Sequence, residues 1–295
     1  MKILLLGPSG QLGWELQRAL APLGELVVCG REQGGDLANP DTLAATVRAA
    51  RPDVIVNAAA HTAVDKAESE PELARAINAT APGVLAIEAA TLGATLLHYS
   101  TDYVFDGSGS EARDEQAPTG PLSVYGRSKL EGEQLIRASG CRYLIFRTSW
   151  VYGARGGNFA KTMLRLAAER EALNVINDQI GAPTGADLLA DVSAHALRRL
   201  AQQPELSGTY HVAAGGETSW HGYAQFVIEL ARAQGRLLKV APDAVRPIPT
   251  TAYPTPAQRP LNSRLDTRRF QQAFELRLPA WQVGVTRLLA EIANS

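Results

Sequence analysis

Three glycines spaced three residues apart follow directly after the first apolar run of the chain, and they restrict the possible folds more than any other feature. They are Gly7, Gly10 and Gly13. Between a strand and a helix, such glycines permit a tight turn, a close approach of the backbone to a pyrophosphate and close packing of the helix on the sheet. Gln11 and Leu12 then open a helix whose free N–H groups face the phosphates. The pattern predicts a dinucleotide-binding turn.

Short apolar runs alternate with longer stretches of helical spacing up to about residue 150. Runs that are apolar on both faces are typical of a parallel sheet covered by helices on each side. The alternation therefore predicts an α/β fold with a doubly wound parallel sheet, the Rossmann arrangement. The expected strands are residues 2–6, 26–29, 54–57, 95–100 and 143–147, and the expected helices are 12–21, 42–50, 71–92 and 124–138.

The rhythm loosens after residue 150, where we expect a smaller α/β domain. We predict a dinucleotide-binding domain over residues 1–150 and a substrate-binding domain over 151–295, with segments that can return to the first. Six prolines between 242 and 260 predict an extended loop, and loops of this length usually cover or line a site. The other expected elements are helices at 158–169, 187–201, 219–233, 267–274 and 279–292 and a strand at 209–212.

Charge and cysteine content exclude several classes of protein. The 29 basic and 30 acidic residues leave a formal charge of −1, which provides no field to gather nucleic acid or an anionic membrane. The two cysteines, Cys29 and Cys141, cannot form a disulfide framework, and no Cys/His cluster has zinc-ligand spacing. No stretch approaches the ~20 apolar residues of a membrane span, and the first apolar run is too short for a signal peptide. We expect a cytoplasmic protein.

The residues after the second expected strand bear on which dinucleotide is bound. NAD sites usually carry an acidic residue at the end of this strand, whereas here Gly30 and Arg31 follow it. Arg31 suits a 2′-phosphate, and one charge-assisted hydrogen bond is worth about 1.5–3 kcal/mol, roughly ten- to a hundred-fold in affinity. We therefore expect NADPH, with NADH also usable; the alternative for Arg31 is a solvated surface charge. Asp36 is placed either to meet the adenine or to cap its own loop.

Tyr125 and Lys129 lie four residues apart in an expected helix, so their side chains share one face. A phenol titrates near 10 in isolation, and a neighbouring ammonium eases proton transfer by stabilising the phenolate. Thr101 follows the fourth expected strand, at the sheet edge where open α/β sheets bind ligands, and its hydroxyl can orient a carbonyl oxygen. A Tyr-x-x-x-Lys pair alone is commonly surface packing; combined with the glycine turn and Thr101, it indicates a catalytic set.

These motifs together resemble the extended short-chain dehydrogenase/reductase family, and within it the branch that completes dTDP-L-rhamnose. The resemblance covers the whole chain. Its most specific stretches are residues 10–16, 57–70, 100–105, 147–152, 177–179, 181–185 and 253–256. It implies that NADPH delivers a hydride to C4 of a dTDP-linked 6-deoxyhexulose and that Tyr125 protonates the alkoxide. A reduced ketone does require one hydride and one proton.

The resemblance also implies roles for particular residues. Cofactor contacts are expected from Gly10, Gln11, Leu12, Asp36, Leu37, Ala60, His61, Thr62, Tyr125 and Lys129. Thr101, Asp102 and Trp150 are expected to face the sugar nucleotide, although a core aromatic is the alternative for Trp150. A diphosphate needs cationic partners, for which Lys161, Arg165 and Arg259 are candidates, exposed ion pairs being the alternative.

By the same resemblance, Glu15, Asp187 and Glu291 would hold Mg²⁺ at the interface of a homodimer. Asp187 is one methylene shorter than the glutamate expected there, and Mg²⁺ is strict about distance, so three surface acids without a metal are the alternative. Two other functions stay open. One is a non-catalytic NADP-binding regulatory subunit, which the presence of Tyr125, Lys129 and Thr101 disfavours; the other is a nucleotide-sugar epimerase or dehydratase, which Gly30 and Arg31 disfavour.

Overall fold

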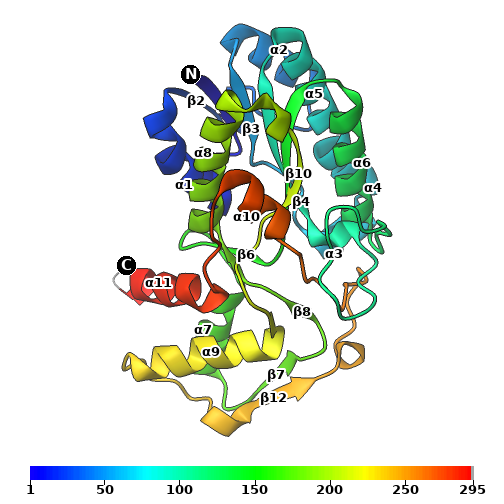
Figure 1. The fold of residues 1–295 in the computed structure, drawn as a ribbon. Helices are drawn as coiled ribbons and strands as arrows, with labels where there is room; N and C mark the ends of the chain where they lie inside the picture. The colour runs from blue at the N-terminus through cyan, green and yellow to red at the C-terminus, as the bar shows by residue number, and fades with distance from the viewer. Residues whose placement is uncertain (294–295) are drawn as a thin grey trace.

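The computed structural model describes residues 1–293 and is built on a sheet of six parallel strands in the order β10-β5-β4-β3-β1-β2 (Figure 1). The chain leaves β1 first toward β2 and then, in the opposite direction, toward β3, so the connections diverge beside β1. Ligands bind at such a point, outside the carboxyl ends of the strands. The α/β prediction is confirmed. The strands are β1 (Lys2–Leu6), β2 (Glu25–Cys29), β3 (Val54–Asn57), β4 (Thr95–Thr101), β5 (Arg142–Thr148) and β10 (Gly208–His211).

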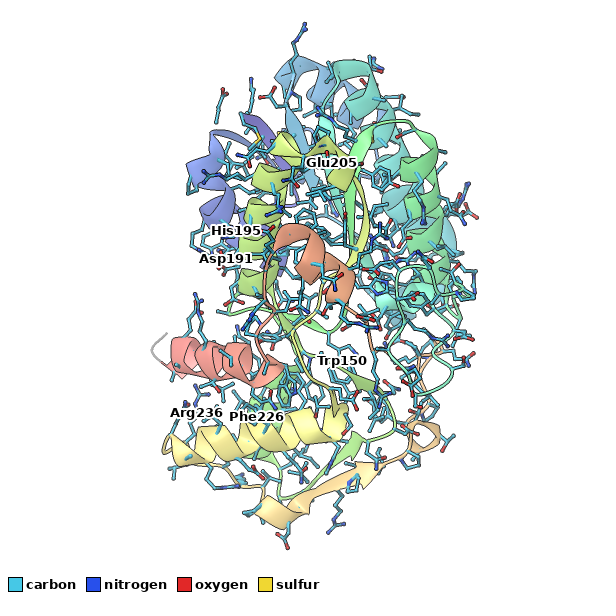
Figure 2. All side chains as sticks on the ribbon, viewed as in Figure 1. Trp150, Asp191, His195, Glu205, Phe226 and Arg236 are labelled. Carbon is cyan, nitrogen blue, oxygen red and sulfur yellow. The ribbon has the colours of Figure 1, made fainter. Side chains whose placement is uncertain are left out.

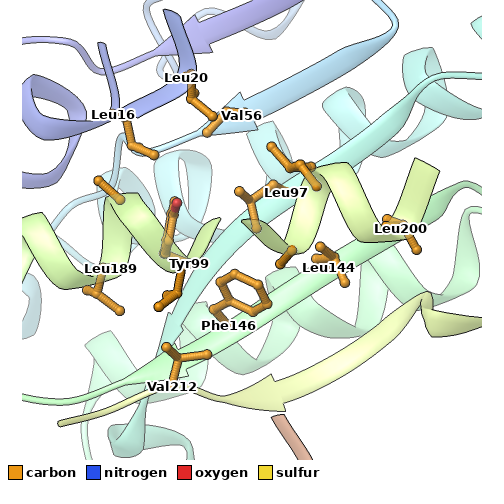
Figure 3. Packing of buried hydrophobic residues seen from close by; sticks show 14 of the residues in the cluster. Leu16, Leu20, Val56, Leu97, Tyr99, Leu144, Phe146, Leu189, Leu200 and Val212 are labelled. Carbon is orange, nitrogen blue, oxygen red and sulfur yellow. The ribbon is translucent and has the colours of Figure 1, made fainter. Parts of the chain in front are cut away.

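Helices cover both faces of this sheet. One face carries α1 (Gln11–Leu20) and α8 (Ala186–Gln202), and the other carries α2 (Pro40–Ala50), α5 (Ala81–Leu92) and α6 (Val124–Ala138). Figure 3 shows the core on the first face, where leucines of both helices meet apolar side chains of the central strands. Since every residue of β4 is buried, its carboxyl end is held rigidly at the edge of the sheet.

The single helix expected over residues 71–92 is divided into α4 (Pro71–Arg75), a π-helical segment (Ala76–Thr80) and α5. Pro82 has no N–H to donate to the carbonyl of Asn78, which explains why the regular ladder fails there. A further short helix, α3 (Val64–Ser69), precedes α4.

The second half of the chain forms a smaller layer beyond the carboxyl edge of the sheet, but β10 and α8 return to the sheet itself (Figure 1). The domain boundary near residue 150 stays a prediction. The helices of this half are α7 (Phe159–Glu169), α9 (Trp220–Ala233), α10 (Arg268–Phe274) and α11 (Trp281–Ala293). Its short strands are β6 (Val151–Tyr152), β7 (Leu173–Ile176), β8 (Ile180–Gly181), β9 (Thr184–Gly185), β11 (Thr218–Ser219) and β12 (Val245–Ile248).

The expectation of an uninterrupted loop over residues 242–260 is wrong at β12, which pairs in parallel with β7. Pro247 stands in this strand opposite Val175. A proline is compatible with a strand whose N–H is not needed by the ladder, as at the edge of a two-stranded sheet. Within residues 1–293, none of the helices has both the length and the apolar character needed to cross a membrane.

Candidate active site

A cavity of about 620 Å³ opens where β1, β3, β4 and β5 end. It lies between the sheet and the smaller layer, at the junction where Trp150 is labelled in Figure 2. The structure therefore brings together residues from both halves of the chain. The predicted site residues that line it are Gly7, Gly10, Gln11, Leu12, Ala60, Thr62, Thr101, Asp102, Tyr125, Lys129, Trp150 and Arg259.

The glycine turn has the backbone geometry that its sequence predicts. Gly7 has a φ of 78°, and a Cβ there would lie 2.7 Å from the backbone nitrogen of Ala59. A Cβ on Gly13 would lie 1.9 Å from the carbonyl oxygen of Gly7. Gly10 precedes α1 without a side-chain cap, so the first N–H groups of the helix stay available. The turn fits the pyrophosphate of a dinucleotide, which would bind against those N–H groups.

Tyr125 and Thr101 are brought together by close packing of α6 on the turn that follows β4. The hydroxyl of Ser123 accepts a hydrogen bond from the Gly126 N–H at 3.2 Å and starts the helix. A Cβ on Gly126 would lie 2.3 Å from the carbonyl oxygen of Tyr103, so only glycine allows this approach. Thr101 and Tyr125 both line the cavity. Burial raises the pKa of Tyr125 above 10 and Thr101 slightly lowers it, with smaller effects from other nearby groups, so the phenol is protonated at neutral pH.

Lys129 is fully buried beneath the cavity, one helical turn after Tyr125. Its Nζ donates to the carbonyl oxygen of Tyr99 at 2.6 Å and lies 3.0 Å from Nε2 of His98. Burial lowers the pKa of Lys129 from 10.5 to about 8, and the carboxylate of Glu133 opposes this change.

Asp102 is a buried carboxyl at the cavity wall. Its Oδ1 accepts a hydrogen bond from the Thr101 hydroxyl at 3.0 Å, and its Oδ2 has no partner among residues 1–293. Burial raises the pKa of Asp102 from 3.8 to about 6, although hydrogen bonds partly offset that effect. A polar atom that is buried without a partner at a cavity wall is well placed to meet a hydroxyl of a ligand.

Trp150 and Trp220 form an aromatic wall, of which the sequence predicted only Trp150. Their rings stack with centroids 3.7 Å apart and planes at 15°, and both line the cavity. Trp150 has a φ of 50°, uncommon for a bulky residue, and the indole N–H of Trp220 donates to Gln179 at 3.0 Å. Trp220 was missed because it lies 70 residues after Trp150, and no local pattern marks it.

Of the three cations proposed for the diphosphate, only Arg259 reaches the cavity. Its guanidinium donates to Asp65 at 2.7 Å and to the Tyr103 hydroxyl at 3.1 Å. Lys161 instead donates to backbone carbonyls of the loop before α7, including Gly156 at 3.0 Å. Arg165 is exposed and pairs with Glu169 at 2.9 Å. The structure therefore places neither Lys161 nor Arg165 at the cavity, and their contact with the diphosphate stays a prediction.

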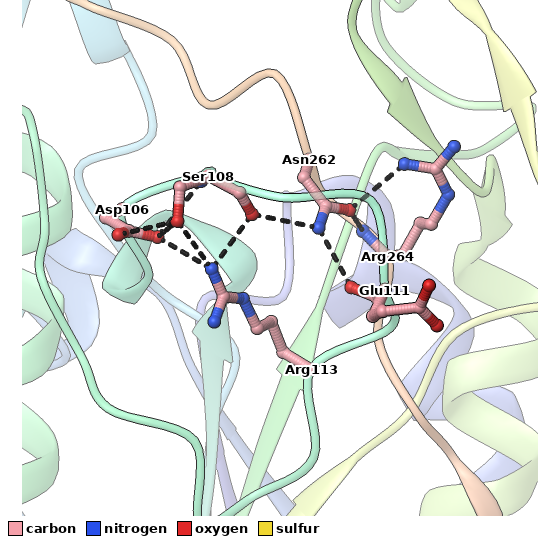
Figure 4. A network of polar contacts seen from close by, with 6 residues as sticks. All are labelled: Asp106, Ser108, Glu111, Arg113, Asn262 and Arg264. Atoms are coloured by element: carbon pink, nitrogen blue, oxygen red, sulfur yellow. Dashed lines mark hydrogen bonds and ion pairs between the residues drawn. The ribbon is translucent and has the colours of Figure 1, made fainter.

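A polar network holds the segment that carries Arg259 against the loop after β4 (Figure 4). Arg113 donates to Asp106 at 3.0 Å and to the carbonyl of Ser108 at 2.8 Å. The amide of Asn262 donates to the carbonyls of Ser108 at 3.2 Å and Glu111 at 2.9 Å. Because Tyr103 begins the same loop, the network keeps Arg259 beside it.

Several predicted cofactor contacts lie outside the cavity lining. The Arg31 side chain is 80% exposed, with its Nε 3.7 Å from a carboxylate oxygen of Asp36, and Leu37 is buried in the core. Asp36 accepts the Ala38 N–H at 3.1 Å, which is the loop cap weighed as its alternative. His61 donates its backbone N–H to Asn78 at 2.8 Å, and its ring lies 3.6 Å from Glu70.

Glu15, Asp187 and Glu291, the predicted metal ligands, line one small pocket. Among residues 1–293 no three acidic, histidine or cysteine side chains are grouped to hold a metal. Asp187 pairs with Arg287 at 3.3 Å, and Glu15 lies 3.5 Å from Arg18. These ion pairs give two of the three carboxylates an arginine partner, without a metal ion.

Comparison with known proteins matches residues 1–294 to the family described as the RmlD substrate binding domain. A dTDP-4-dehydrorhamnose reductase from Shigella flexneri is 58% identical over 99% of this chain and 98% of its own length. A solved dTDP-4-dehydrorhamnose reductase from Clostridium acetobutylicum is 35% identical, with a TM-score of 0.90 over 99% of this chain and all of that one. Another, from Bacillus anthracis in complex with NADP, is 35% identical with a TM-score of 0.88, over 98% of this chain and 99% of that one.

Proposed function

Since the chain belongs to the RmlD substrate binding domain family, we propose that it reduces the C4 ketone of dTDP-4-dehydro-L-rhamnose with NADPH, giving dTDP-L-rhamnose. The observation that carries this proposal is one cavity lined by the glycine turn, Thr101, Tyr125 and Lys129. Full-length similarity to dTDP-4-dehydrorhamnose reductases and the NADP bound to the Bacillus anthracis protein support it.

The residues of the cavity divide the work of a ketone reduction. A bound reduced nicotinamide supplies the hydride. Tyr125 donates its phenolic proton to the oxygen that becomes an alkoxide, and Thr101 lines the cavity beside it. Lys129, held by the Tyr99 carbonyl, stabilises the phenolate that remains.

The remaining lining residues bind the sugar nucleotide in this proposal. Arg259 can contact the diphosphate, because its hydrogen bonds to Asp65 and Tyr103 hold its guanidinium at the cavity wall. Asp102 accepts a hydrogen bond from a sugar hydroxyl through its unpartnered Oδ2. Trp150 and Trp220 present an apolar face to the deoxysugar.

NADPH oxidation, followed by absorbance with freshly made dTDP-4-dehydro-L-rhamnose, tests this function. We expect one NADPH oxidised per dTDP-L-rhamnose formed. The same sugar linked to UDP is the control for recognition of the thymine base. dTDP-glucose, which lacks the ketone, is the control for the reduction itself. Absence of oxidation would refute the proposal, and tightly held NAD that returns its hydride to the sugar would show an epimerase instead.

We propose that NADPH is the preferred cofactor and that Arg31 binds its 2′-phosphate. The Arg31 side chain is 80% exposed, and the ion pair it makes among residues 1–293 is a long one, with Nε 3.7 Å from Asp36, so it can turn toward a phosphate. Arg31→Ala should therefore raise KM for NADPH roughly ten- to a hundred-fold and leave KM for NADH unchanged. An unchanged ratio of the two constants would remove Arg31 from cofactor selection.

A homodimer bridged by Mg²⁺ stays a proposal that requires donors from a second chain. Sedimentation in Mg²⁺ and in EDTA tests it, with Glu15→Gln as a variant. A dimer that persists in EDTA would contradict bridging by metal.

A further inference from the structure

His98 stands under the active site and takes no part in the reduction described above. It lies in the middle of β4, opposite Asn57 of β3, and only 1% of each residue is exposed. The imidazole lies between two polar groups: Nε2 is 3.0 Å from Lys129 Nζ, and Nδ1 is 3.2 Å from the amide nitrogen of Asn57. A buried histidine in direct contact with a catalytic lysine needs an explanation.

The orientation of Asn57 determines which ring nitrogen carries the proton. Its Oδ1 accepts the Ala59 N–H at 3.2 Å, so its NH₂ group is turned toward His98. An NH₂ group can only donate, so Nδ1 must be the acceptor and Nε2 must carry the ring hydrogen. Nε2–H then points at Lys129, where it needs a lone pair, and an ammonium has none.

Lys129 satisfies that requirement in its uncharged state. A neutral amine accepts from Nε2–H through its lone pair and still donates to the Tyr99 carbonyl. Among the charged groups nearby, Glu133 favours the ammonium, but its carboxylate is bound by Arg147 at 2.7 and 2.9 Å and by Ser100 at 2.6 Å. Tyr99, whose phenol is paired with Ser193, and Tyr125 are the other titratable groups around it.

We propose that His98 is a positioning residue for the reduction: its Nε2–H, held in that tautomer by Asn57, stabilises the amine of Lys129 after the lysine returns a proton to Tyr125. The proton count balances. Tyr125 gives its proton to the alkoxide, the resulting phenolate takes one from the Lys129 ammonium, and the neutral amine recovers a proton from water in the open cavity. The inference rests on the proposed function, because it concerns how Tyr125 is restored between turnovers.

Two lowered pKa values agree with this geometry. Burial lowers the pKa of Lys129 to about 8, and burial together with the nearby Lys129 lowers the pKa of His98 well below 6.5. His98 is therefore neutral over the working range, and the proton that titrates belongs to Lys129.

The pH profile of kcat/KM separates a positioning role from a structural one. Activity should fall with rising pH as Lys129 loses its proton. In His98→Gln the amide can turn its oxygen toward the Lys129 ammonium and stabilise it. The pKa of the alkaline limb, where activity falls, should therefore rise by about 0.7 pH unit, equivalent to one hydrogen bond. Asn57→Asp should move it in the same direction, since a carboxylate accepts from Nδ1–H and frees Nε2 to accept.

The matched control is His211→Gln, which makes the same exchange at a histidine that is also fully buried, on the edge strand β10. His211 is neutral because burial lowers its pKa to about 4, so its replacement should leave the limb in place. A folded His98→Gln protein with the wild-type limb would overturn the inference.

Nitrogen-15 NMR of the unaltered protein tests the tautomer without any variant or activity. The five histidines give a simple spectrum. We expect His98 to carry its hydrogen on Nε2, and a hydrogen on Nδ1 would contradict the assignment. Failure of the proposed reductase activity would leave this spectrum unchanged, so the two outcomes are distinguishable.

Discussion

Replacing Asp102 with asparagine measures how much the burial of this one carboxylate in the active site lowers the free energy of unfolding. The carboxyl is 2% exposed, and burial raises its pKa from 3.8 to about 6. A raised folded-state pKa means that the folded protein holds the proton more tightly than the unfolded chain. The stability this contributes is present in full below the unfolded pKa and is lost as the pH rises through about 6.

The magnitude follows from the two pKa values. One pKa unit is worth about 1.4 kcal/mol, so wild type should lose about 3 kcal/mol over the whole titration, of which about 2 kcal/mol falls between about pH 4.5 and 7.5. The Asp102→Asn variant has no such loss, and any cost of its unpaired amide is independent of pH. The unfolding free energy of the variant minus that of wild type should therefore rise by about 2 kcal/mol across this interval.

Urea unfolding at several pH values, followed by fluorescence, measures this difference. Asp243→Asn, at an exposed aspartate in the 3-10 turn before β12, is the matched control, and its difference should stay flat. A flat difference for Asp102→Asn would show that the carboxyl is solvated in the folded protein and would refute the electrostatic account of the site.

Three further substitutions test other parts of the cavity. Gly13→Ala forces a Cβ against the Gly7 carbonyl, so the free energy of unfolding should fall by about 1–3 kcal/mol and NADPH should bind more weakly. The control is Gly157→Ala, whose Cβ would lie in open space, and it should change neither quantity. Trp220→Ala removes the stack on Trp150 and should lower kcat/KM for the sugar nucleotide up to about tenfold, with partial recovery in Trp220→Phe. Arg259→Met should raise KM for the sugar nucleotide roughly ten- to a hundred-fold without changing NADPH binding, and equal effects on both would place Arg259 outside the diphosphate site.

The parts of the molecule that local sequence determines are the parts that could be predicted. The turn at Gly7 and the placement of Tyr125 and Lys129 one turn apart on α6 depend on residues within a few positions of each other, and the alternation of buried strands with helices predicts the sheet. Strands of two residues, such as β6 and β9, have no periodicity to detect. Pairing with a distant strand also makes Pro247 part of β12, which its local sequence opposes.

Contacts between the two halves of the chain were the least predictable. Charge alone suggested Lys161 and Arg165, but only the packing of α7 shows that both are engaged on its surface. Trp220 reaches the cavity because α9 begins beside Trp150, a contact across 70 positions. His98 looked like one more residue of a buried strand until the position of Lys129 was known.

The rate of the chemical step in Tyr125→Phe, compared with Tyr103→Phe, tests the central claim most directly. The two rings lie edge to face in the same cavity, with centroids 5.5 Å apart. Each variant therefore removes one phenolic hydroxyl from nearly the same place, and the comparison isolates the contribution of Tyr125. Single-turnover NADPH oxidation should slow by about 10²–10⁴ in Tyr125→Phe and by less than about tenfold in Tyr103→Phe, with NADPH binding retained in both. A Tyr125→Phe protein that reduces the ketone within about tenfold of the wild-type rate would show that the proton comes from another group.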